Sequence, residues 1–98
     1  MSSANEALAI FGKWKREQTS LNLIVLAPDE VVEPSMVALD VLISHADPSQ
    51  LRWVIGAESI SRSLSNVSGF TATPDGTSLE ISFSDRSRLV FVERDRSS

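Results

Sequence analysis

The spacing of the apolar residues changes near residue 18, and this change limits the folds open to the chain more than any other feature. Across residues 4–17 apolar side chains recur at every third or fourth position, as they do on one face of a helix. From residue 19 onward the period changes to two, as in strands, and the first of these segments is apolar on much of both faces. The sequence therefore predicts one N-terminal helix followed by a mainly β domain.

The predicted helix spans about residues 4–17. Ser3 and Glu6 have the S-x-x-E spacing of a capping box, in which each side chain bonds a free amide at the helix start. We expect the helix to pack across one open end of the sheet through its apolar stripe, which contains Leu8, Phe11 and Trp14.

Six segments have the alternation or the turn boundaries of strands: about 19–26, 36–45, 51–57, 70–73, 79–84 and 88–93. Asp47 and Pro48 begin one turn between them, and Pro74 with Gly76 marks another. In the second strand the alternation predicts that the side chains facing the core are Val37, Leu39, Val41 and Ile43.

Residues 58–69 fit two patterns, and the sequence leaves their structure open. Ile60, Leu64 and Val67 suit a helical period, whereas the many serines of this segment favour a loop or an edge strand.

These segments together predict a small antiparallel barrel of five or six strands, or a strongly bent sheet, with the N-terminal α-helix packed on it. We expect a single domain over residues 1–98, with the barrel at about 19–94 and a frayed tail at 95–98. A two-layer α+β sheet is the alternative.

Composition excludes several classes of protein. The chain has no cysteine, so disulfide scaffolds and thiolate chemistry are absent. No apolar run approaches the roughly 20 residues of a membrane span, so we expect no membrane contact and a cytoplasmic location. Residues 28–58 contain six acidic residues and one basic residue, which argues against nucleic acid as a partner.

No catalytic or metal motif is recognisable, and we expect neither enzyme activity nor a cofactor. His45 is the only histidine and lacks the surroundings of a catalytic triad. The acidic segment contains Asp29, Glu30 and Glu33, and its composition favours a solvated loop over a metal site. Trp14 and Trp53 lie on periodic apolar faces and are expected in the core.

The order of a helix, the strand sequence LNLIVL, the segment VALDVLISHAD and the strand LRWVI resembles the Sm-like family of small β-barrels. That resemblance implies an N-terminal helix stacked on five bent strands, assembly through edge strands, and RNA binding. The glycine usual in the second strand of the family is missing between Met36 and Ile43.

A second resemblance is to PilZ domains, which are β-barrels that bind cyclic di-GMP. Two segments resemble their ligand motifs: the basic one before the first strand, and the one that begins at Asp47. Arg52 stands where that family has glycine. The residues that this resemblance implies for an anionic ligand are Lys13, Lys15, Arg16, Asp47, Ser49 and Arg52.

The leading hypothesis for function is a non-catalytic module for protein interaction or self-association, because a short meander leaves edge strands unpaired. The first alternative is a sensor that binds a nucleotide or another small anionic ligand. RNA binding ranks third.

Overall fold

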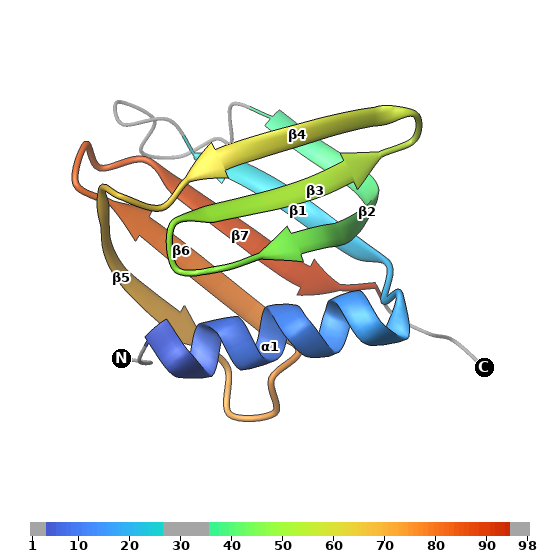
Figure 1. Ribbon diagram of the computed structural model, residues 1–98, viewed down its shortest axis with the longest axis horizontal. Coiled ribbons are helices and arrows are strands. Elements are labelled where there is room, and N and C mark those ends of the chain that lie inside the picture. Colours follow the sequence, from blue (N-terminus) through green and yellow to red (C-terminus); the bar gives the residue numbers. More distant parts are fainter. Residues whose placement is uncertain (1–3, 27–35, 95–98) are drawn as a thin grey trace.

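The computed structural model describes residues 4–26 and 36–94, which form one helix and one antiparallel sheet (Figure 1). The elements in chain order are α1 (Ala4–Glu17), β1 (Leu21–Leu26), β2 (Met36–Ala46), β3 (Gln50–Ile55), β4 (Glu58–Ser63), β5 (Val67–Ala72), β6 (Ser78–Phe83) and β7 (Arg88–Glu93). The mainly β fold with an N-terminal helix is confirmed. The predicted count of five or six strands is wrong, because the serine-rich segment forms one further strand, β4, together with the start of β5, and the sheet has seven.

The sheet is open, so the closed barrel is also wrong. Its strand order is β4-β3-β2-β1-β7-β6-β5, which is a meander joined through β1 and β7. Closure would require β4 to pair with β5, but these two strands are the edges. Figure 1 shows the reason: after the turn that follows β4, the chain runs away from β4 towards α1 instead of back along it.

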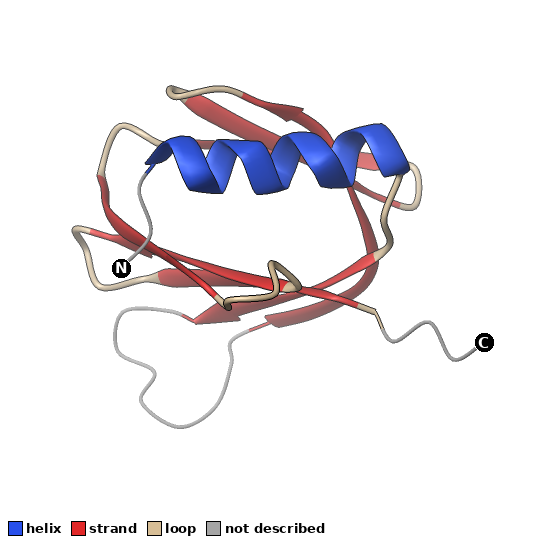
Figure 2. Ribbon diagram, turned by 90° about the horizontal axis from the view of Figure 1, so that it is seen from below, coloured by secondary structure: helices blue, strands red, loops and turns tan. Residues whose placement is uncertain are grey.

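The bend of the sheet arises largely within β2, the longest strand at 11 residues. Its pairing with β1 shifts register between Leu21 and Leu23, and its pairing with β3 shifts between Ile43 and His45. Each shift leaves one extra residue on β2, which is a β-bulge and bends the strand. Figure 2 shows the sheet curving around α1.

The first bulge overturns one prediction about the core. Val37 and Leu39 were expected to face inward, but they are 55% and 58% exposed, while Val41 is buried as expected. The extra residue lies beside Asp40, whose φ is +59°. Because side chains alternate with a period of two, one inserted residue sends every position before it to the opposite face.

The core is built around aromatic rings from the helix and the sheet. The ring of Phe91 on β7 lies 5.5 Å from that of Phe11 and 5.6 Å from that of Trp53. Trp14 is fully buried, and its Nε1 donates to Glu93 Oε2 at 2.9 Å. Both tryptophans therefore belong to the core as predicted, although Leu8 is only half-buried.

The helix ends at a Schellman motif, in which Gln18 has a φ of +50° and the Thr19 amide donates to the carbonyl of Trp14. At 14 residues this helix is too short to cross a membrane, and the described residues contain no other. The predicted Ser3 cap, the acidic segment with Asp29 and the tail at 95–98 lie outside the described residues.

Candidate functional site

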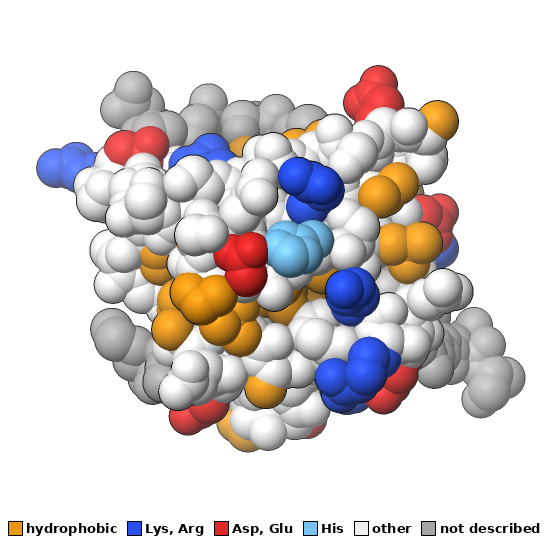
Figure 3. All heavy atoms as spheres, in the orientation of Figure 1, with side chains coloured by type: hydrophobic (Ala, Val, Ile, Leu, Met, Phe, Trp, Pro, Cys, Tyr) orange, Lys and Arg blue, Asp and Glu red, His pale blue; other side chains and the backbone are white. Residues whose placement is uncertain are grey.

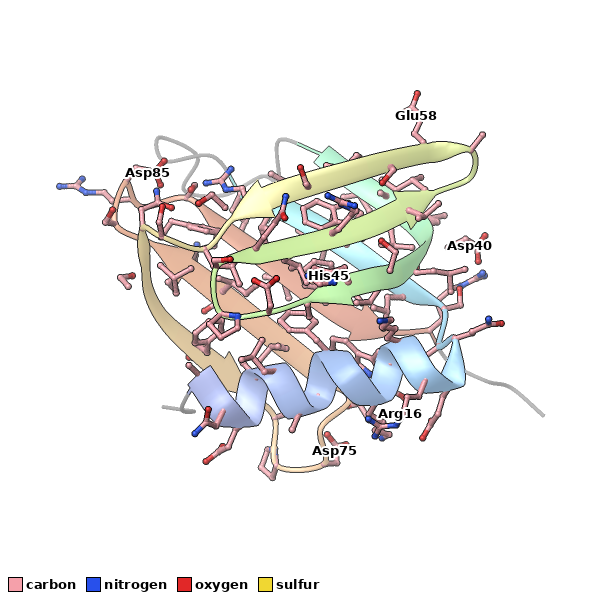
Figure 4. The ribbon with its side chains drawn as sticks, in the orientation of Figure 1. Arg16, Asp40, His45, Glu58, Asp75 and Asp85 are labelled. Atoms are coloured by element: carbon pink, nitrogen blue, oxygen red, sulfur yellow. The ribbon has the colours of Figure 1, made fainter. Side chains whose placement is uncertain are left out.

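The three cations predicted from the basic segment lie in the last turns of α1. Lys13 Nζ is 3.9 Å from Glu93 Oε2, so its charge is partly matched by that carboxylate. Lys15 and Arg16 are exposed. Figure 4 shows Arg16 extending below the helix, on the side away from His45.

Asp47 organises the turn between β2 and β3. Its Oδ1 accepts from the amide and the hydroxyl of Ser49, each at 2.8 Å, and from the Gln50 amide. Its Oδ2 is 2.6 Å from His45 Nε2. The hydrogen bond from His45, followed by those from Ser49, holds the pKa of Asp47 below its ordinary value. Both carboxylate oxygens therefore already have partners within the turn.

Arg52 stands beside this turn on the outer face of the sheet. It is paired with His45 across β2 and β3, so the two side chains are neighbours on one face. Lys and Arg side chains lie above and below the single histidine on that face (Figure 3). The structure thus joins Asp47 to Ser49 directly and places Arg52 beside His45, which contacts Asp47, whereas Arg16 points elsewhere.

A shallow hollow of about 410 Å³ lies between the first half of α1 and the turn from β5 to β6. Its lining is mostly apolar, with two carboxylates, and consists of Glu6, Ala9, Ile10, Ala72 and residues 73–76. The Asp75 carboxylate accepts from the hydroxyls of Thr73 and Thr77, which lowers its pKa. Among residues 4–26 and 36–94, no group of acidic or histidine side chains is arranged to hold a metal ion.

The sequence analysis did not predict an apolar strip that lies on the outer face of β2. Leu42 is 39% exposed and joins Val37 and Leu39. Val37 is paired with Ile24 on β1, and Leu42 with Val54 on β3. Asp40, a polar residue within an apolar run, was the available signal of the bulge that turns this strip outward.

β4 lies in the segment whose structure the sequence left open. It pairs with β3 over residues 58–63 without any shift of register. A two-residue turn with Gly56 at a φ of +60° joins the two strands. Alternation places the side chains of Ser59, Ser61 and Ser63 on the outer face and those of Glu58, Ile60 and Arg62 on the inner one.

Arg62 spans the opening between β4 and the turn from β6 to β7. Its guanidinium carbon lies 4.1 Å from the centre of the Phe83 ring, and its Nη2 donates to Ser87 Oγ at 3.4 Å. The Ser87 hydroxyl and amide in turn donate to Asp85, and these bonds lower the pKa of Asp85, with a smaller contribution from the charge of Arg62. The cation therefore covers the core where the sheet does not close.

Comparison with protein-family models, with curated proteins and with solved structures finds no match for this chain. The geometry described above is therefore what any statement about its function rests on.

Proposed function

We propose that this chain is a non-catalytic association module that binds an extended segment of a partner protein as an additional strand along β4. The observation that carries the proposal is the exposed edge of β4, which pairs with β3 on one side only among the described strands. In Figure 1 β4 forms the upper front rim of the molecule.

The free side of β4 has the backbone geometry that strand addition requires. In a two-residue hairpin the residues flanking the turn form a hydrogen-bonded pair, here Ile55 and Glu58. Because backbone groups alternate in direction along a strand, the amides and carbonyls of Ser59 and Ser61 point away from β3. These groups are available to an incoming strand.

β4 also lacks three of the devices that protect edge strands in monomeric proteins. It has no proline, no lysine and no bulge. Its outer side chains are serines, which are small enough to let another backbone approach. An extended partner segment with alternating side chains therefore fits this edge best.

Ser61→Pro tests the proposal. The Ser61 amide faces the free edge, so proline removes a donor to the partner without removing a hydrogen bond to β3. Association, with a second copy or with another protein, should weaken at least tenfold, as measured by sedimentation and by binding to immobilised chain. Ser61→Thr keeps the amide and should bind like the wild type.

Two results would count against strand addition at β4. One is association that is unchanged in Ser61→Pro. The other is a wild-type chain that stays a strict monomer at millimolar concentration and captures no protein.

An anionic-ligand sensor is the second candidate, favoured by the pairing of Arg52 with His45 on an exposed face. A phosphate group bound there would contact the guanidinium directly. Calorimetry with cyclic di-GMP tests this candidate, and Arg52→Ala should abolish the heat of binding. An absence of heat with the wild type at millimolar ligand contradicts it.

A further inference from the structure

We infer that the partner strand is β4 of a second copy of this chain, paired antiparallel about a two-fold axis at Ile60. This inference rests on the proposed strand addition and adds the identity and the register of the partner. It follows from the sequence of charges along the edge.

Only one register matches the charges of β4 with those of a second β4. With Ile60 opposite Ile60 of the other copy, each Glu58 lies opposite Arg62 of the other copy. Directly opposed side chains of an antiparallel pair are neighbours, and opposite charges there stabilise the pairing. Shifting the register by two residues either way sets Ile60 opposite Glu58 or Arg62 and separates the charges.

The backbone is consistent with the same register. Ser59 then lies opposite Ser61 of the other copy, and both residues have their amides and carbonyls directed at the free edge. Such a pair exchanges two hydrogen bonds. Ile60 falls in the closer, non-hydrogen-bonded position, where its half-exposed side chain can meet its copy.

Side-chain placement favours this pairing as well. Glu58 is exposed, and no described residue forms an ion pair with it. Figure 4 shows it extending from the start of β4 away from the body of the molecule. Arg62 is held in place by Phe83 and Ser87, so its charge is already positioned on the inner face of the edge.

Charge exchange tests the register by sedimentation from about 10 µM to 1 mM. Glu58→Lys sets like charges opposite each other twice in the symmetric dimer and should weaken it by about tenfold or more. Arg62→Glu should do the same. An equimolar mixture of these two variants should associate again, because each contact then joins opposite charges.

Cysteine crosslinking tests the same register without touching Arg62. The chain has no cysteine, so Ile60→Cys introduces a single thiol that lies opposite its copy and should form a disulfide-linked dimer under mild oxidation. Ser59→Cys is the matched control: two such residues are two positions out of register, so their Cα atoms lie roughly 8–9 Å apart, beyond the roughly 7 Å that a disulfide spans. This variant should form no disulfide-linked dimer under the same oxidation.

Each outcome decides between the two proposals. Suppose that Ser61→Pro disrupts the dimer, but that Ser59→Cys crosslinks as well as Ile60→Cys or that charge exchange leaves the affinity unchanged. This result overturns the register and still supports strand addition at β4. A monomeric wild type that binds a different protein in a manner sensitive to Ser61→Pro overturns self-pairing only. Recovery of the mixed dimer with selective Ile60→Cys crosslinking supports both.

Discussion

The two edges of the sheet differ in how their backbone is protected. β5 has a bulge between Val67 and Gly69, and α1 packs against it. β4 pairs with β3 in unbroken register and has no helix beside it among the packed elements. Edge strands without protection are templates for further pairing. The difference is the reason that our proposal places association at β4 and not at β5, which has a bulge and lies against α1.

The outer face of β2 offers a second contrast with β5. Val37 and Leu39 are exposed there, whereas the apolar side chains of β5 are partly buried against the core. The same device, a bulge, occurs in both strands. In β2 it turns apolar residues outward, and in β5 it interrupts an edge.

Loosening the packing of α1, which lies against β5, should lower the free energy of unfolding more than any other change considered below. Phe11 is fully buried and its ring meets those of Trp14 and Phe91, so Phe11→Ala should lower the free energy of unfolding by about 3–5 kcal/mol. Urea denaturation measures this loss. Because the loosened helix contacts β5, amide exchange should accelerate more in β5 than in β4.

The half-buried Leu8 provides the control for that change, and Leu8→Ala should cost clearly less. Equal acceleration of exchange in β4 and β5 would show that α1 does not protect β5 selectively.

Removing the cation beside β4 should have a smaller effect. Arg62→Met keeps an apolar stem over Phe83 but loses the charge and the bond to Ser87. We expect thermal unfolding to report a loss of about 0.5–1 kcal/mol. Arg52→Met, at an exposed position of β3, should stay within about 0.5 kcal/mol of the wild type. If the two variants lose the same stability, Arg62 does not cover the core.

The turn that follows β5 should make the smallest contribution, which is a change in how the free energy of unfolding depends on pH. Hydrogen bonds from Thr73, and then from Thr77, lower the pKa of Asp75 below its ordinary 3.8. A lowered folded pKa gives stability that is present above the unfolded value and lost as pH falls through the folded one. Denaturation between pH 5 and pH 2 should therefore show a shallower acid loss for Asp75→Asn than for the wild type. Parallel curves would contradict this role.

Local pattern predicted much of the fold. Phe11 and Trp14 are buried where the helical period placed them, and Val41, Ile43 and Trp53 are buried where strand alternation placed them. The turn around Asp47 and the turn at Pro74 and Gly76 also occur at the predicted positions. These features depend on neighbours in sequence, which is why periodicity and turn chemistry were sufficient.

The candidate site was less accessible to prediction. The sequence grouped Arg16 with Arg52 on the basis of a family resemblance, but they extend in different directions. It left residues 58–69 open, because a serine-rich segment has similar local preferences for loop and strand. Whether Ser59 and Ser61 belong to an edge depends on β3 lying on one side and on the absence of a described strand on the other.

The amino-acid sequence by itself determined where the helix ends, that strands follow it, and that Phe11, Trp14 and Trp53 belong to the core, since each of these follows from local spacing and hydrophobicity. Only the tertiary structure decided that the sheet stays open, that Val37 and Leu39 face outward, and that β4 is the exposed edge. Those outcomes depend on which distant strands pair and where one extra residue is placed between them, and the free energy of such pairing is set by contacts across the sheet.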